Sequence, residues 1–149
     1  MACEEERLLE EAVDRLRSLD EQLQGMREDL EEVLNAQSAL LACLREYAPQ
    51  YFQADGRRPD VLAELESLEQ APAFEYRASD CGAARRALLE ASSRASALSF
   101  LLAEVLHQLR VESVRLAGLV ALCRHFEPQL SERVYGEVLD RALRNYVGV

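Results

Sequence analysis

The chain has 149 residues, of which 49% are hydrophobic and 30% charged, so its composition is that of a folded or coiled-coil protein rather than a disordered one. Its net charge of -10, with 13 of the 27 acidic residues in positions 1–48, offers no basic face to nucleic acid and opposes docking on anionic lipid. No apolar run is long enough for a membrane span, so we expect neither nucleic-acid binding nor direct membrane insertion.

Residues 1–48 predict a long helix, because apolar side chains recur at alternating steps of three and four residues from Leu9 to Tyr47. Eleven of the twelve positions on this stripe are apolar, and Gln37 is the exception. A heptad pattern that runs over six repeats without proline is typical of a coiled coil. The three glutamates at positions 4–6 suit the amino end of this helix, where the helix dipole favours negative charge.

Residues 49–79 predict a connection with a short helix inside it, since Pro49, Pro59 and Pro72 interrupt the helical pattern. Aromatic side chains gather here and have two interpretations. They pin the short helix onto the end of the rod, or they form a knob that binds a partner, because exposed aromatics often anchor interfaces. The residues of this secondary interface candidate are Tyr51, Phe52, Phe74 and Tyr76.

A second stripe predicts a long helix over residues 80–127, which Asp80 can cap and which ends before Pro128. Two helices of this length would extend about 65–70 Å, whereas a compact globule of this size is only about 38 Å across. We therefore expect an elongated molecule. The connection suits an antiparallel hairpin, in which residues 33–44 would face residues 83–94 and large side chains would meet small alanines.

Gln37 and Glu112 are the polar residues within the two apolar stripes, and two interpretations are open. They set the register of the packed helices, as single polar residues do in coiled coils, or they are partly exposed where each stripe drifts away from the core. Val111 and Val114, which lie off the second stripe, indicate a bend in the helix at this point.

Residues 128–149 predict a final helix that begins at Pro128 and has one apolar face. It is expected to cover the end of the rod where the second stripe broadens. Both it and the first helix should leave part of their apolar faces open to another chain. The residues of this predicted partner interface are Leu9, Leu16, Leu19, Leu23, Met26, Tyr135, Leu139 and Tyr146.

Residue patterns for catalysis are absent from the sequence. His107 and His125, the two histidines, occupy outward positions of the second helix. There is no glycine-rich phosphate loop, and the paired carboxylates lie on an outer face rather than in the buried setting that acid–base catalysis requires. We therefore expect no enzyme activity, no cofactor, no metal and no small-molecule substrate.

The four cysteines lack the spacing of metal ligands, and reduced thiols are the expected state. Cys43 flanks the first stripe and Cys123 lies in the second, so both should be buried and unpaired. Cys3, at a terminus that can fray, should be free and exposed. The fourth cysteine is Cys81.

The predicted fold is a single all-α unit over residues 1–149, an elongated antiparallel coiled coil with a short capping helix and a C-terminal helix. The layout is similar to that of small helical subunits in large coiled-coil assemblies, such as those of spindles, kinetochores, motor adaptors and vesicle tethers, although no sequence motif carries the similarity. We expect a non-catalytic structural subunit of a hetero-oligomeric cytoskeletal, spindle or trafficking complex, whose partners are other coiled-coil proteins. The expected location is the cytoplasm, with the cytoskeleton or the nucleus as alternatives. The alternative function is a self-folding helical adaptor that binds a partner helix or peptide transiently.

Overall fold

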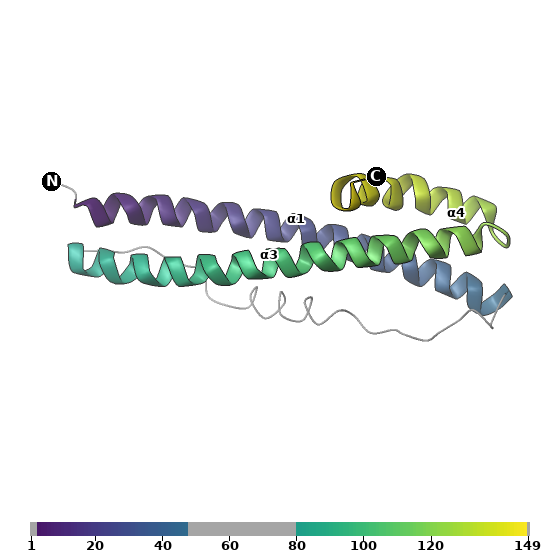
Figure 1. Cartoon of the computed structure of the whole chain (residues 1–149), viewed down its shortest axis with the longest axis horizontal. Coiled ribbons are helices and arrows are strands. Elements are labelled where there is room, and N and C mark those ends of the chain that lie inside the picture. Colours follow the sequence, from purple (N-terminus) through teal and green to yellow (C-terminus); the bar gives the residue numbers. More distant parts are fainter. Residues whose placement is uncertain (1–2, 48–79, 149) are drawn as a thin grey trace.

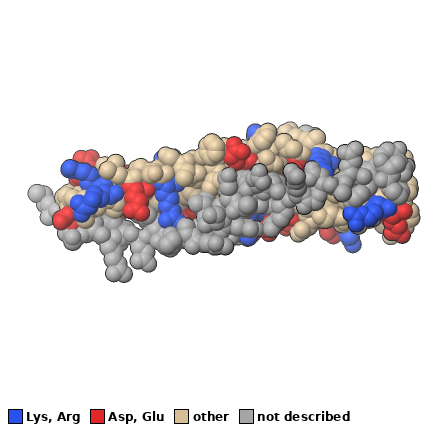
Figure 2. Space-filling view, turned by 90° about the horizontal axis from the view of Figure 1, so that it is seen from below, with Lys and Arg blue, Asp and Glu red and all other residues tan. Residues whose placement is uncertain are grey.

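The computed structural model describes residues 3–47 and 80–148, and every regular element in these ranges is a helix. Two long helices, α1 (Glu4–Tyr47) and α3 (Cys81–Cys123), pack along each other and give the molecule the shape of a rod (Figure 1). A view from below shows the same elongated outline, with basic and acidic side chains next to each other at both ends (Figure 2). The all-α fold and the elongated shape expected from the sequence are confirmed.

A shorter helix turns back from the end of α3 and lies along one half of the rod (Figure 1). We call residues 128–147 the C-terminal helix; its consecutive segments are α4 (Pro128–Val134), η2 (Tyr135–Leu139), α5 (Asp140–Ala142) and η3 (Leu143–Val147). The two η segments are π-helical, so the backbone amide of Gly148 donates to the carbonyl oxygen of Leu143, five residues earlier, at 2.8 Å. Gly148 itself, with a φ of 82°, ends the helix in the left-handed conformation that glycine tolerates.

The two long helices run in the same direction, and the antiparallel hairpin expected from the sequence is wrong. At their amino ends, the guanidinium of Arg85 donates to Glu5 Oε1 at 3.1 Å. Towards their carboxyl ends, the thiol of Cys123 donates to the carbonyl oxygen of Leu40 at 3.3 Å. The partners are 80 residues apart in the first pair and 83 in the second. A nearly constant offset of this kind arises only when helices are parallel.

The antiparallel prediction was wrong because it took the connection between the two long helices to be a turn. A turn between adjacent helix ends needs only a few residues, but the segment between Tyr47 and Asp80 joins opposite ends of the rod. Helix α3 has 43 residues and is therefore about 65 Å long, while an extended chain covers about 3.3 Å per residue. Residues 48–79 are thus numerous enough to span the rod. The short capping helix predicted in this segment, together with Tyr51, Phe52, Phe74 and Tyr76, lies outside the described residues.

The amino-terminal half of the rod has a seam of leucines packed against alanines. Its buried residues include Leu9, Leu16 and Leu23 from α1 and Ala84, Ala91 and Ala95 from α3. The prediction that large side chains would meet the alanines of the second helix is therefore correct in kind. The segment that supplies the large side chains is the start of α1, and the expected pairing of residues 33–44 with 83–94 is wrong.

The carboxyl-terminal half of the rod contains three helices, because the C-terminal helix packs over both α1 and α3. These helices share one apolar core. Its buried residues are Val33, Ala36, Leu40, Cys43, Leu44, Leu116, Leu119, Val120, Cys123, Val134, Leu139 and Ala142. The final helix therefore covers the carboxyl ends of both long helices.

Helix α3 is continuous over its whole length. Its start is capped by Asp80, whose Oδ1 accepts a hydrogen bond from the backbone amide of Ala83 at 2.7 Å. The helix passes through residues 111–114 without interruption, so the bend predicted there is not a break in the helix. The reason is that Glu112 is paired inside the rod and does not have to turn outward.

Candidate partner-binding surfaces

Most of the predicted partner interface on α1 is internal to the folded chain. The side chains of Leu9, Leu16 and Leu23 are buried against α3, with Leu9 completely inaccessible. Leu19 and Met26 are partly buried and pack against the same core. The prediction that part of this stripe stays open to another chain is therefore wrong, because α3, running parallel to α1, covers it from its first turns.

The three interface residues predicted on the C-terminal helix differ in their surroundings. Leu139 belongs to the core, whereas Tyr135 is 44% exposed. Tyr146 is partly buried, and its hydroxyl donates to Asp29 of α1. Burial, and then the hydrogen bond to Asp29, raise the pKa of Tyr146 above its ordinary value. The structure therefore leaves only Tyr135 of these three residues as an exposed side chain.

The two polar residues of the apolar stripes meet each other inside the rod. Gln37 Nε2 donates to Glu112 Oε2 at 2.6 Å and to the backbone carbonyl of Glu112 at 2.9 Å. The side chains are only 4% and 9% exposed, so the interpretation that they lie at a drifting, exposed edge is wrong. A buried polar pair of this kind penalises every other register, because a shifted helix would leave both groups without a partner.

At the carboxyl ends of the long helices, an aromatic pair closes the rod. The rings of Tyr47 and Phe126 are stacked, with centroids 6.0 Å apart and planes inclined by 9°. The Tyr47 hydroxyl donates to Glu127 Oε1 at 3.1 Å. This hydrogen bond, followed by the charge of Glu46, raises the pKa of Tyr47. Tyr47 therefore contributes to closing this end of the rod.

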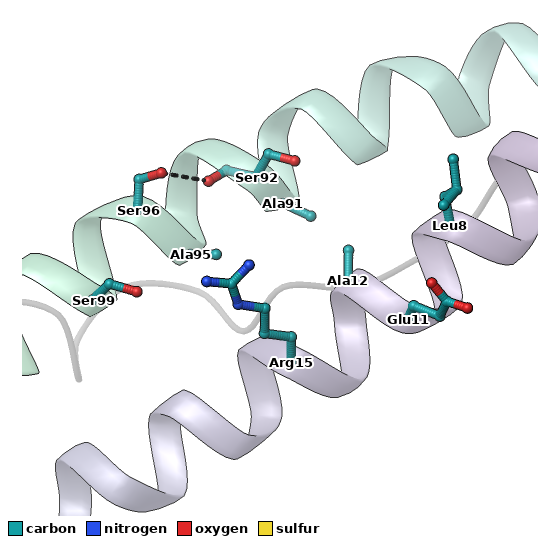
Figure 3. A pocket seen from close by; sticks show the side chains of 9 residues that line it. All are labelled: Leu8, Glu11, Ala12, Arg15, Ala91, Ser92, Ala95, Ser96 and Ser99. Atoms are coloured by element: carbon teal, nitrogen blue, oxygen red, sulfur yellow. Dashed lines mark hydrogen bonds between the residues drawn. The ribbon is translucent and has the colours of Figure 1, made fainter.

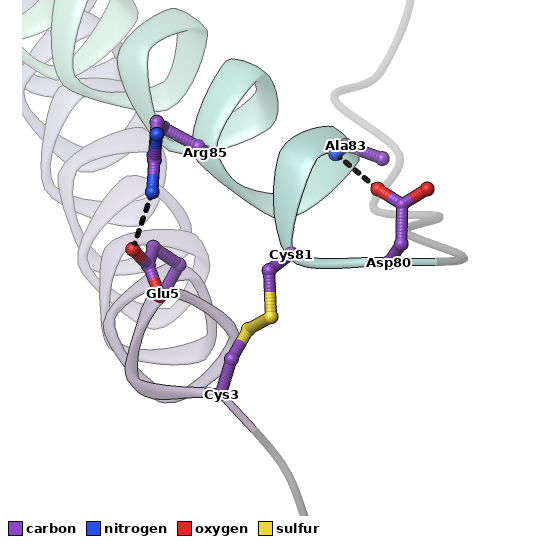
Figure 4. The surroundings of a disulfide bond; sticks show 6 residues. All are labelled: Cys3, Glu5, Asp80, Cys81, Ala83 and Arg85. Atoms are coloured by element: carbon purple, nitrogen blue, oxygen red, sulfur yellow. Dashed lines mark hydrogen bonds and ion pairs between the residues drawn. A yellow bond between two sulfur atoms is a disulfide. The ribbon is translucent and has the colours of Figure 1, made fainter.

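At the opposite end, a disulfide joins Cys3 to Cys81 (Figure 4). The prediction that Cys3 is a free thiol is wrong, because parallel helices bring the two amino ends together. Glu5 lies beside the disulfide, and a backbone hydrogen bond and then the Arg85 guanidinium hold the pKa of its carboxyl below the ordinary value. Its carboxylate oxygen and the two sulfur atoms lie within 4.8 Å of one another, a donor set that would suit a zinc ion if the thiols were reduced.

The other two cysteines are free and buried, as the sequence predicted. Burial, and then the neighbouring Cys43 thiol, raise the pKa of Cys123 to about 12. A thiol with so high a pKa is protonated at neutral pH and reacts slowly. Both cysteines therefore serve as core residues.

A groove of about 610 Å³ opens between α1 and α3 in the amino-terminal half (Figure 3). Small residues line its floor and the α3 wall, whereas Leu8, Glu11 and Arg15 stand on the α1 wall. The residues from the floor and the α3 wall are Ala12, Ala91, Ser92, Ala95, Ser96 and Ser99.

Further along the rod, the C-terminal helix occupies this same groove. On α1, Leu8 and Arg15 are four and three heptads before Ala36, which is buried beside the C-terminal helix. On α3, Ser92 is exposed, while Ser113, three heptads later, is completely buried. The C-terminal helix thus fills one half of a long groove, and the other half is open.

The outward face of α3 is a surface that the sequence analysis did not identify. Five large apolar side chains on this helix are exposed, and those of Leu89 and Phe100 are the most exposed, at 68% and 65%. The complete set, which we call the outer stripe, is Leu89, Phe100, Val111, Val114 and Leu122. The missed signal was the recurrence of large apolar residues at outward positions of this helix.

Both histidines of the chain lie within the described residues. His107 and His125 are both exposed, as predicted. Within residues 3–47 and 80–148, no helix is both long and apolar enough to cross a membrane. No family model matches the chain, and neither a curated protein nor a solved structure matches it.

Proposed function

We propose that the protein is a non-catalytic helical subunit that binds other helical proteins along its rod, as a structural component of a coiled-coil assembly. The observation that supports this most is the half-filled groove. In one half of the rod, a third helix packs between α1 and α3, and in the other half the same groove is open over Ala91 and Ala95. A partner helix in the open half would complete a three-helix rod of uniform thickness.

The groove suits a helix for physical reasons. Its floor of alanines lets another backbone approach closely, and its wall of serines offers hydroxyl groups. Arg15 and Glu11 stand at its edge, where they can form ion pairs with a partner. We assign the assembly to the cytoskeletal, spindle or trafficking type on the basis of the rod-like layout alone.

Blocking the groove tests this proposal. Ser96→Arg combined with Ser99→Arg fills the wall with long side chains and should release the tagged chain from the larger complex in which it is recovered from its own cells. Ala42→Arg on the outward face of α1 is the matched control, since it also adds an arginine at an exposed position. The size of the native complex is the measurement. A doubly substituted chain that stays in the same complex contradicts the groove as the binding site.

A self-folding adaptor is the second candidate, and a separate observation favours it. The apolar stripes of both long helices are buried within the chain itself, so the rod has a core without a partner. Purification of the chain alone separates the two functions. An adaptor should give a monodisperse species with a cooperative thermal transition, whereas an obligate subunit should aggregate or melt without a sharp transition.

A further inference from the structure

The amino ends of the two long helices bring three metal-binding side chains together. The sulfur atoms of Cys3 and Cys81 and a carboxylate oxygen of Glu5 lie within 4.8 Å of one another (Figure 4). Thiolate and carboxylate groups are both ligands of zinc in proteins. The two cysteines are 78 residues apart in sequence. The expectation of no metal site rested on local spacing, which parallel helices do not need to bring ligands together.

The positions of the two cysteines suit a zinc ion as well as a disulfide. Their Cα atoms are 6.1 Å apart, within the range that a disulfide requires. Two sulfurs bound to one tetrahedral zinc ion at about 2.3 Å lie about 3.8 Å from each other. Rotation of the side chains can provide this separation while the helices stay in place. Cys3 also precedes the first residue of α1, so its backbone is not held by the helix.

The surroundings of the three side chains favour negatively charged ligands. Cys81 is the first residue of α3 and Cys3 immediately precedes α1, so both lie where a helix dipole favours a thiolate. The Arg85 guanidinium donates to Glu5 Oε1 at 3.1 Å and holds the carboxylate beside the sulfurs. Hydrogen bonds of this kind orient metal ligands. The charges of a zinc ion and Arg85 together balance those of two thiolates and one carboxylate.

We propose that the reduced protein binds a zinc ion between the amino ends of α1 and α3, with Cys3, Cys81 and Glu5 as ligands and water in the fourth position. A dithiol reductant, itself oxidised to a disulfide, breaks the S–S bond and gives the two sulfurs two electrons and two protons. Zinc then displaces both protons. The ion holds the two helices together in place of the disulfide. This inference goes beyond the proposed function and does not depend on it.

Cobalt(II) tests the ligands, because thiolates bound to it give a charge-transfer band in the near ultraviolet. The full-length protein is reduced with a dithiol and freed of it under nitrogen. Cobalt should then produce the band, and zinc should abolish it by binding in its place with a Kd of about 1 μM or tighter. The oxidised protein should give no band. Absence of the band from the reduced protein, or an equal band from the oxidised protein, overturns the proposal.

Substitutions test the location. Cys3→Ser and Glu5→Gln should each weaken zinc binding by the reduced protein at least about tenfold, and Cys3→Ser should also remove about half of the cobalt band. Zinc should raise the Tm of the reduced wild type but not that of Cys3→Ser. Cys43→Ala, which removes a thiol from the core, is the matched control and should bind zinc as the wild type does. Circular dichroism confirms that each variant folds. Wild-type affinity in Cys3→Ser or Glu5→Gln, or its loss in Cys43→Ala, overturns the proposal.

Discussion

In the amino-terminal half of the rod, two helices share a seam of leucines against alanines, whereas in the carboxyl-terminal half a third helix covers both and a polar pair crosses the seam. The alanines bring the helix backbones close together but bury little apolar area. The disulfide between Cys3 and Cys81 then fixes the open end covalently. The second half has no such link and depends on the volume of its core.

One pair of heptad stripes is thus stabilised in two different ways along its length. Where three helices meet, packing carries the stability, and a buried polar pair can be accommodated. Where two of the described helices meet without a third, their ends would fray without a covalent tie. The open half is also the half with the unfilled groove, so binding and stability are linked there.

The largest expected difference between the halves concerns core leucines. Leu40 and Leu9 are both completely buried, the first in the three-helix half and the second near the disulfide end. Leu40→Ala should lower the free energy of unfolding by about 2–5 kcal/mol, because the packed core cannot collapse around the cavity. Leu9→Ala should cost clearly less, since fewer helices enclose Leu9 and its surroundings can collapse into the cavity. Urea unfolding followed by circular dichroism measures both, and equal costs would show that the halves are equally packed.

Removing the disulfide should act mainly on the two-helix half. Cys3→Ser should destabilise the oxidised protein by about 2–4 kcal/mol, because a long closed loop is released in the unfolded chain. Hydrogen exchange should increase in the first turns of α1 and α3 but not around Leu116. The double variant Cys3→Ser with Cys81→Ser serves as the control and should match the single one. If reduction of the wild-type protein by a dithiol changes neither quantity, the bond does not stabilise the rod.

The smallest of the three effects concerns the buried polar pair. Gln37→Leu leaves the Glu112 carboxylate without its side-chain donor inside the rod, and should cost about 1.5–3 kcal/mol. Substituting both residues with leucine should recover the loss, because two apolar groups need no hydrogen bond. Thermal and urea unfolding of the wild type, Gln37→Leu, Glu112→Leu and the double variant give the coupling between the sites. Additive losses in the double variant would contradict the pairing.

Sequence periodicity predicted the helices well and their direction badly. The stripes place α1 and α3 within a few residues of their observed ends, because heptad repeats and prolines act locally. Direction depends on contacts between distant residues, which periodicity does not encode. The clue was the polar pair: an antiparallel hairpin separates Gln37 from Glu112, and only a parallel arrangement lets each satisfy the other. Cys3 and Cys81, each at the amino end of a long helix, can likewise be joined only if the helices are parallel.

The candidate binding surfaces were predicted less well for the same reason. Leu16 and Leu23 were predicted to form an interface because an antiparallel arrangement would leave them uncovered. In the structure, α3 runs parallel to α1 and buries them. The outer stripe was readable in the sequence, since Phe100 and Val114 occupy outward positions, which a helix face in water usually fills with polar residues. The open groove depends on where the C-terminal helix ends, and that requires the structure.

Parallel helices also determine how the chain must fold. In a hairpin, contacts next to the turn close short loops and guide the remainder, but here the hydrogen-bonded pairs between α1 and the α3 region are 75 to 83 residues apart in sequence throughout. Every such contact therefore has the same high entropic cost of loop closure, and none is favoured to form first by proximity. The contacts between α3 and the C-terminal helix are much more local, with Arg110 bonded to the Tyr146 carbonyl 36 residues later. We infer that folding begins in this helix pair and that α1 docks onto it last.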